Sequence, residues 1–214
     1  TTFGGVQDGF IAKFNSNGVR LWGTYYGGSG GEILQGIDID NNGYIYVTGR
    51  TAGTSSSNSI ATSGTFQSAY SGAGSDAIVI KFNSSGVRLW GSYFGGNGDD
   101  WGRKIVTDIN GDVYILGDTK STDVIASIGA HQSAFSGGTQ PDAFLVKFNP
   151  TGSVIWFKWI NGSGNDYSRT VTTDTAGNVY YSGNTTSSSI TVPNANNTLI
   201  TYTGGASEDV FIIK

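Results

Sequence analysis

The stretch Asp8-Gly-Phe-Ile-Ala-Lys-Phe-Asn15 decides the fold, because the chain repeats it. Close copies are Asp76-Ala-Ile-Val-Ile-Lys-Phe-Asn83 and Asp142-Ala-Phe-Leu-Val-Lys-Phe-Asn149, and Asp209-Val-Phe-Ile-Ile-Lys214 starts another; successive copies are 68, 66 and 67 residues apart. A unit of this length, with short apolar segments separated by Gly and Asn, is a small sheet that must stack on its neighbours to bury both faces. The sequence therefore predicts a series of stacked β-units.

The composition limits the class of protein. The chain has 214 residues, of which 37% are hydrophobic and 13% aromatic, and this is enough apolar material for a core. Its 34 glycines suit many strands joined by tight turns. The 12 basic and 16 acidic residues give a net charge of −4, which argues against nucleic acid as a partner. The chain has no cysteine, so disulfides and thiol chemistry are excluded, and no apolar run is long enough for membrane insertion.

Each repeat is expected to hold four antiparallel strands. Segment 10–14 is nearly all apolar, an Asn- and Gly-rich turn follows, and segment 19–22 alternates between apolar and polar residues, so these two segments predict a hairpin. The small, moderately apolar segment 36–40 is typical of the strand that lines the axis of a propeller, and segment 44–47 is expected to pair with it. The predicted fold class is therefore all-β, a β-propeller with four-stranded antiparallel blades and a repeat of about 67 residues.

The copies divide residues 1–214, a single propeller segment, into roughly three to three and a half blades. We expect residues 8–26 to form a half blade, 35–93 and 102–159 to form complete blades, and 168–214 to form an incomplete one. Joined head to tail, these parts would close a ring of only three, whereas propellers use about four to eight blades. Either the chain is a segment of a longer propeller, or a second copy completes it as a six-bladed dimer or a strand-exchanged polymer.

The motifs of the repeat resemble those of a known family. The resemblance is carried by Asp142-Ala-Phe-Leu-Val-Lys-Phe-Asn149, Tyr25-Tyr-Gly-Gly-Ser-Gly30, Asp40-Asn-Asn-Gly-Tyr-Ile-Tyr-Val-Thr-Gly49 and Gly129-Ala-His-Gln-Ser-Ala-Phe-Ser-Gly-Gly138. Over essentially its entire length the chain resembles the SBBP-type, seven-bladed β-propeller repeat, in a variant similar to those of Bacteroidetes. The resemblance implies a secreted or cell-surface bacterial protein, and it brings no catalytic residue.

A glycine-rich corner follows the predicted hairpin, as at Gly95-Gly-Asn-Gly98 and Asn161-Gly-Ser-Gly164, and four residues beside these corners are the candidate ligand contacts. The carboxylates of Asp100 and Asp166 close their corners, and the aromatic residues Trp101 and Tyr167 follow them directly. An aromatic ring beside a carboxylate suits a ligand surface at the rim of the propeller. A carboxylate after a glycine-rich bend also accepts hydrogen bonds from free backbone amides. The two interpretations, a ligand site and a structural cap, both remain open from the sequence.

Two further sets of residues are expected to be structural. Arg103 and Arg169 lie three residues after Asp100 and Asp166, so we predict that they pair with these acids or with a neighbouring blade. The residues that recur in register at the end of the predicted hairpin are Trp22, Trp90 and Trp156. Because their spacing follows the repeat, we predict that they pack between blades.

The turns that begin with Asp40, Asp108 and Asp174 are candidate Ca²⁺ sites, because each starts like an oxygen-ligand loop. An EF-hand-like loop also carries further carboxylates and a distal Glu, which do not follow here. Asp ahead of Gly is equally typical of a hairpin turn, where the side chain caps its own backbone. Turn capping is therefore the first interpretation, with Ca²⁺ binding as the alternative, and no other cofactor is expected.

The chain is not expected to be an enzyme. Catalytic sites are asymmetric, whereas these motifs recur in every repeat, and the lone histidine, His131, has no Ser-His-Asp arrangement around it. The favoured function is a noncatalytic extracellular or cell-surface scaffold, adhesin-like, that binds other blades of the same protein or another copy of itself. The alternatives are a carbohydrate-binding propeller that contacts surface glycans and the subunit of a strand-exchanged filament.

Overall fold

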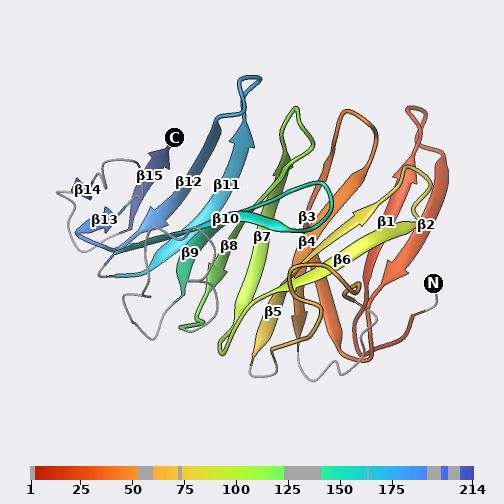
Figure 1. Ribbon diagram of the computed structural model, residues 1–214, viewed down its shortest axis with the longest axis horizontal. Coiled ribbons are helices and arrows are strands. Elements are labelled where there is room, and N and C mark those ends of the chain that lie inside the picture. Colours follow the sequence, from red (N-terminus) through yellow and green to blue (C-terminus); the bar gives the residue numbers. More distant parts are fainter. Residues whose placement is uncertain are drawn as a thin grey trace.

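The computed structural model describes residues 3–52, 60–71, 74–122, 141–162, 164–191, 199–201 and 208–214. Within these ranges every regular element is a β-strand, and the strands form sheets that follow one another from the N-terminal side to the C-terminal side (Figure 1). The described residues contain no helix that would be long and apolar enough to cross a membrane. The predicted fold class, an all-β protein built from four-stranded antiparallel sheets in about three blade-like units, is confirmed.

The first two sheets show the repeat unit. The N-terminal sheet is a hairpin of β1 (Gly9–Phe14) and β2 (Arg20–Tyr26). The next sheet has four strands in the order β3-β4-β5-β6, each antiparallel to its neighbours. Their bounds are β3 (Gly31–Ile39), β4 (Ile45–Ala52), β5 (Ser75–Phe82) and β6 (Arg88–Phe94). In repeat register, β1 and β2 correspond to β5 and β6, the last two strands of a blade.

The other two sheets repeat this plan with changes. One contains β7 (Asp100–Thr107), β8 (Val113–Thr119), β9 (Asp142–Phe148) and β10 (Val154–Gly162). The last contains β11 (Asp166–Thr173), β12 (Val179–Thr185) and β15 (Asp209–Ile213), in that order. The first strands of successive sheets meet, since β3 contacts β7 and β7 contacts β11. These inner strands contain the segments predicted to line the propeller axis.

Two short strands lie in the long connection between β12 and β15, outside the four strands predicted for each repeat. They are β13 (Ser189–Thr191) and β14 (Leu199–Thr201), and β13 pairs with the outer strand β10. Ile190 of β13 is completely buried. The physical reason is that the outer edge of a blade exposes unpaired backbone groups, and the long connection covers part of that edge.

The turns follow the sequence signals closely. In the turn between β5 and β6, the Asn83 Oδ1 atom accepts hydrogen bonds from the backbone amides of Ser85 at 3.0 Å and Val87 at 2.9 Å. Gly86 has a φ of +79°, a conformation that residues with a side chain rarely adopt. The equivalent turns at Asn15 and Asn149 make the same amide bonds. The hairpin is therefore specified locally in each repeat.

The apolar cores lie between the sheets. The largest cluster joins the β3–β6 sheet to the β7–β10 sheet and includes Phe94, Phe144, Phe148 and Phe157. The Phe94 and Phe144 rings are 5.1 Å apart. Two similar clusters join the β1–β2 hairpin to the β3–β6 sheet and the β7–β10 sheet to the β11–β12–β15 sheet. Each sheet therefore depends on its neighbours for burial, as the repeat predicts.

Candidate functional site

The inner strands each contain one β-bulge at the same repeat position. The pairing of β3 with β4 skips Gln35, that of β7 with β8 skips Arg103, and that of β11 with β12 skips Arg169. Each of these residues lies three positions after the acidic residue of its corner. A bulge bends the strand and redirects the side chain of the extra residue. The three bulges therefore present long polar side chains from three successive blades.

These side chains meet at a cavity of about 570 Å³, which we call the axial cavity. The residues that line it are Gln35, Arg103, Lys104, Asp118, Tyr167, Ser168, Arg169 and Glu208. The inner strands β3, β7 and β11 all contribute to its wall. Of the four residues predicted to contact a ligand, Tyr167 is the one that lines this cavity.

An ion pair at the boundary between two blades holds part of the cavity wall. Arg103 Nε donates a hydrogen bond to Asp118 Oδ2 at 2.7 Å. The other oxygen, Asp118 Oδ1, accepts bonds from the amide and the hydroxyl of Ser168 in the next blade, at 3.0 and 2.6 Å. Arg169 Nε donates to Asn184 Oδ1 at 3.2 Å. The arginines thus bind partners on the second strand of their own blades, and no bond to the corner acids is seen within the described residues.

Trp101 has an environment that differs from a sugar-stacking platform. Its Nε1 donates to Ser75 Oγ at 2.8 Å. Three cationic groups lie around its ring, with Arg103 at 4.7 Å, Arg50 at 5.3 Å and Lys120 at 5.7 Å from the ring centre. Cations are attracted to the face of an indole ring, so these side chains compete with a sugar for it. The ring serves here as a support for the basic side chains beside the axial cavity.

The corner acids are buried caps. Glu32, Asp100 and Asp166 are each 0% exposed. Each accepts a hydrogen bond from the amide of the glycine four residues earlier, at 2.6 to 2.8 Å. The Ser121 hydroxyl donates a further bond to Asp100 at 2.6 Å. Burial raises the pKa of Asp100 to about 6, and burial also raises the pKa of Glu32 and of Asp166. Asp100 and Asp166 therefore close their corners from inside, and neither lines the axial cavity.

The candidate calcium residues cap their own turns. In Asp40, Asp108 and Asp174, one carboxylate oxygen accepts the amides two and four residues later, at 2.8 to 3.0 Å. The other oxygen accepts a tyrosine hydroxyl six residues later, at 2.9 to 3.3 Å. Hydrogen bonds from Asn178 lower the pKa of Asp174 to about 2. Over the described ranges, no group of three or more His, Cys, Asp or Glu side chains is placed to hold a metal ion.

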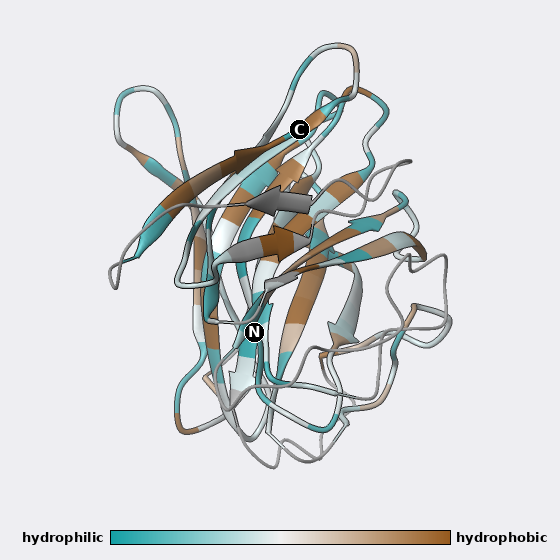
Figure 2. Cartoon of the chain, turned by 90° about the vertical axis from the view of Figure 1, so that its left-hand side faces the viewer, coloured by the Kyte–Doolittle hydropathy of each residue, from teal (hydrophilic) through white to brown (hydrophobic). Residues whose placement is uncertain are grey.

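A second candidate site lies at the two ends of the series of sheets. The N-terminal face consists of Phe10, Phe14 and Tyr25, exposed residues that share one side of the β1–β2 hairpin. The C-terminal face consists of Val210 and Ile212 on β15, which is brown over most of its length in Figure 2. Phe10 is 73% exposed and Ile212 is 77% exposed. Phe144, at the same repeat position as Phe10, is 0% exposed.

The two terminal faces match one another in repeat register. Inside the molecule, a residue at the Phe10 position shares a core cluster with the residue at the Ile212 position of the preceding sheet. The three pairs are Ile78 with Ile11, Phe144 with Val79, and Phe211 with Leu145. Phe10 and Ile212 are the two members of this series that lack such a neighbour among the described residues. The same contact therefore remains available once at each end.

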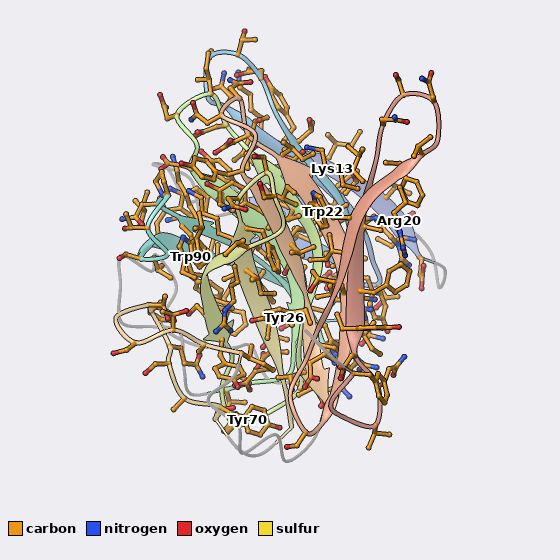
Figure 3. All side chains as sticks on the ribbon, turned by 90° about the vertical axis from the view of Figure 1, so that its right-hand side faces the viewer. Lys13, Arg20, Trp22, Tyr26, Tyr70 and Trp90 are labelled. Atoms are coloured by element: carbon orange, nitrogen blue, oxygen red, sulfur yellow. The ribbon has the colours of Figure 1, made fainter. Side chains whose placement is uncertain are left out.

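A polar contact accompanies two of the three apolar contacts between blades. Lys13 Nζ and Trp22 Nε1 lie side by side on the hairpin (Figure 3) and both donate to the backbone carbonyl of Ser84, at 3.4 and 3.1 Å. Lys81 and Trp90 donate in the same way to the carbonyl of Pro150, at 3.2 and 3.0 Å. The prediction that Trp22 and Trp90 pack between blades is confirmed.

The third copy of this contact is different. Within the described residues, Trp156 Nε1 has no hairpin carbonyl to bind, and the ring packs against Tyr114 at 5.8 Å. Lys147 Nζ forms an ion pair with Asp112 Oδ2 at 2.7 Å. The donor pair at the C-terminal side thus lacks the acceptor that its equivalents use.

The sequence did not reveal the bulges or the axial cavity. The available signal was a long polar residue three positions after the corner acid in each copy, inside a strand of small residues. The sequence interpretation of Arg103 and Arg169, as partners of the corner acids or of a neighbouring blade, did not include a bulge. His131, for which no catalytic arrangement is predicted, lies outside the described residues.

Comparison with known proteins agrees with the repeat. The family model described as "SBBP: Beta-propeller repeat" matches residues 21–61, 89–123 and 155–191, which together exceed half of the chain. An uncharacterized WD repeat-containing protein of Acanthamoeba polyphaga mimivirus is 23% identical over 127 residues, which covers 53% of this chain and 9% of that protein. Three family matches fall in step with the repeated sheets, so the chain belongs to the SBBP β-propeller repeat family.

Proposed function

We propose that this chain is an interaction module that packs against further blades of its own type through its two terminal faces. The observation that carries the proposal is the exposure of Phe10 and Ile212, whose repeat equivalents are buried against each other. Exposed apolar side chains grouped on one surface mark sites of protein association. The partner is another SBBP blade, either in a longer polypeptide or in a second copy of this chain.

The proposed contact stacks intact sheets. Exchange of strands would place β1 of another copy beside β12, where β15 already pairs at five positions from Tyr181 to Thr185. Losing these pairs costs free energy, whereas stacking the N-terminal face on the C-terminal face loses none. Because the two faces differ, the contact is head to tail, and it gives a ring or a filament according to the rotation between copies. Strand exchange therefore becomes the less favoured form of assembly.

Two charge substitutions test the head-to-tail contact. Phe10→Asp blocks the N-terminal face, and Ile212→Asp blocks the C-terminal face. We expect the unmodified chain to gain mass as its concentration rises in sedimentation equilibrium, and each variant alone to remain a single chain. An equal mixture of the two variants should form a one-to-one dimer, because one variant keeps one face and the other keeps its complement.

Leu89→Asp is the matched control, since Leu89 is 45% exposed on the outer strand β6, away from both faces. This variant should assemble like the unmodified chain. An unmodified chain that stays single at every concentration, or a mixture of the two variants that forms no dimer, would contradict docking by a second copy.

We propose further that the module is noncatalytic and acts in a secreted or cell-surface bacterial protein, as an adhesin-like scaffold. The resemblance of the repeat to the seven-bladed, Bacteroidetes-like SBBP variant supports this, and so does the low content of charged residues, 13%. Labelling of intact source cells with a membrane-impermeant amine reagent tests the location. Labelled chain is expected, and a chain that reacts only after cell lysis would contradict the proposal.

A further inference from the structure

Repeat positions that differ from blade to blade gather around the axial cavity. The corner acid, the turn aspartate and the lysine of the hairpin recur in each copy. The two acids accept backbone amides within their own blade, and Lys81 donates to a carbonyl of the next blade. Positions that vary between copies include that of Gln35, Arg103 and Arg169, all of which line the cavity. They also include that of Ile33, Trp101 and Tyr167 and that of Arg50, Asp118 and Asn184, from which Tyr167 and Asp118 line it. A scaffold requires the constant positions, whereas a ligand site is asymmetric. The variable positions therefore indicate where a ligand would be recognised.

The charge around this cavity is opposite in sign to that of the whole chain. Five of the 12 basic residues lie at the cavity or around the neighbouring Trp101 ring: Arg50, Arg103, Lys104, Lys120 and Arg169. The acidic residues there are Asp99, Asp118 and Glu208. The chain as a whole has a net charge of −4. A local excess of positive charge in such a chain favours an anion at this place.

Two of the basic side chains are free to bind a ligand directly. Lys104 is exposed and has no ion-pair partner among the described residues. Arg169 is exposed, its Nε binds Asn184, its guanidinium lies 5.8 Å from the centre of the Tyr167 ring, and it has no ion-pair partner among the described residues. Arg103, in contrast, is already paired with Asp118. Lys104 and Arg169 come from adjacent inner strands and line the same cavity.

The remaining acid limits the charge of the ligand. Glu208 lines the cavity, and its Oε2 accepts a bond from Asn184 Nδ2 at 2.9 Å. A second negative group on the ligand would approach this carboxylate and be repelled. The Tyr167 ring forms part of the wall and offers an apolar surface beside the charged groups. The cavity is therefore suited to a small ligand that carries one anionic group.

We propose that the axial cavity binds a singly charged carboxylate ligand, such as a sugar acid, with Lys104 and Arg169 as its direct contacts. Such a ligand is held by its carboxylate and need not stack on Trp101. Its direct contacts lie on the inner strands β7 and β11, whereas the terminal faces lie on the β1–β2 hairpin and β15, so different substitutions test this site and the docking proposed above.

Calorimetric titration at low salt tests this site with sodium glucuronate, sodium sulfate and glucose as probes. We expect glucuronate to bind, sulfate to bind more weakly because it is doubly charged, and glucose not to bind. Lys104→Gln and Arg169→Gln should each weaken glucuronate binding by about tenfold or more, since each removes a charged hydrogen-bond donor. Both residues are exposed, so the variants are expected to fold, which circular dichroism checks.

Lys158→Gln is the matched control, because it removes the same charge from the outer strand β10. This variant should bind glucuronate as the unmodified chain does. No glucuronate binding, equal binding of glucose, or an equal loss in Lys158→Gln would each overturn the proposal. Sulfate binding stronger than that of glucuronate would overturn the preference for a single charge.

Discussion

Strands β1 and β9 have almost the same sequence motif but contrasting environments. Phe144 and Phe148 on β9 are 0% exposed because the β3–β6 sheet covers them, whereas Phe10 and Phe14 on β1 are 73% and 57% exposed. The residues themselves do not differ in a way that explains this contrast. In a repeat protein, stability is the sum of the units and of the contacts between neighbours. The presence or absence of a neighbouring blade therefore decides whether this motif is core or docking surface.

The largest effect on stability is expected on the covered strand β9. Phe144→Ala removes a fully buried ring from the contact between two sheets, so we expect it to lower the free energy of unfolding by about 3–5 kcal/mol. Phe10→Ala at the equivalent exposed position should change it by less than about 0.5 kcal/mol in dilute solution. Denaturant unfolding of the two variants measures both values. Equal losses would mean that Phe10 is covered in the single chain.

A smaller effect on stability is expected from Asp100, the buried acid of its glycine-rich corner. Because the pKa of Asp100 is about 6 in the folded chain, raised from 3.8 by burial, the ionised carboxylate opposes folding. Its contribution to stability is fully present below about pH 4 and is lost as the pH rises through 6, by roughly 2–3 kcal/mol. Asp100→Asn should therefore gain stability relative to the unmodified chain between pH 4 and pH 7. If the free energy of unfolding of Asp100→Asn and of the unmodified chain changed with pH in parallel, the raised pKa would not belong to Asp100.

The smallest effect on stability is expected at the tryptophans of the hairpins, of which Trp90 donates a hydrogen bond to the next blade. Trp90→Phe removes the bond from Nε1 to the Pro150 carbonyl, while Trp156→Phe removes no bond of this kind. Trp90 is buried in the core between two sheets and Trp156 is only partly buried, so Trp90→Phe loses packing as well as the bond. We expect Trp90→Phe to be more destabilising by at least about 1 kcal/mol, the usual contribution of one hydrogen bond. The difference between the two denaturation midpoints measures it, and a larger loss for Trp156→Phe would count against the role of this contact.

The sequence predicted the fold well because each level of the pattern agrees with the others. The period of the motif at Asp8, Asp76 and Asp142 gave the unit, and the turns ending in glycine gave the hairpins, because both signals are local in the chain. The capping role of Asp40, Asp108 and Asp174 was predictable for the same reason. Strands β13 and β14 were missed because they form on the edge of β10, far away in sequence.

The site was harder to predict because it depends on the relation between strands. A bulge at Arg103 is an offset between β7 and β8, and neither strand shows it alone. Asp100 and Asp166 are candidate ligand contacts in the sequence because they are charged residues beside aromatic rings. The structure shows both carboxylates buried, and burial depends on how the blades stack, which the local sequence does not show. Sequence reasoning therefore found the constant residues of the scaffold and named Tyr167, but it missed Lys104 and the cavity at which Arg103 and Arg169 come together.

Hydroxyl-radical footprinting across a range of protein concentrations tests the central claim, that a neighbouring blade decides the burial of this motif. We expect Phe144 and Phe148 to stay unlabelled at every concentration. Phe10 and Phe14 should be labelled in dilute solution and become protected as the chain assembles. Protection of Phe10 in the single chain, or full labelling of Phe10 in an assembled sample, would contradict this claim.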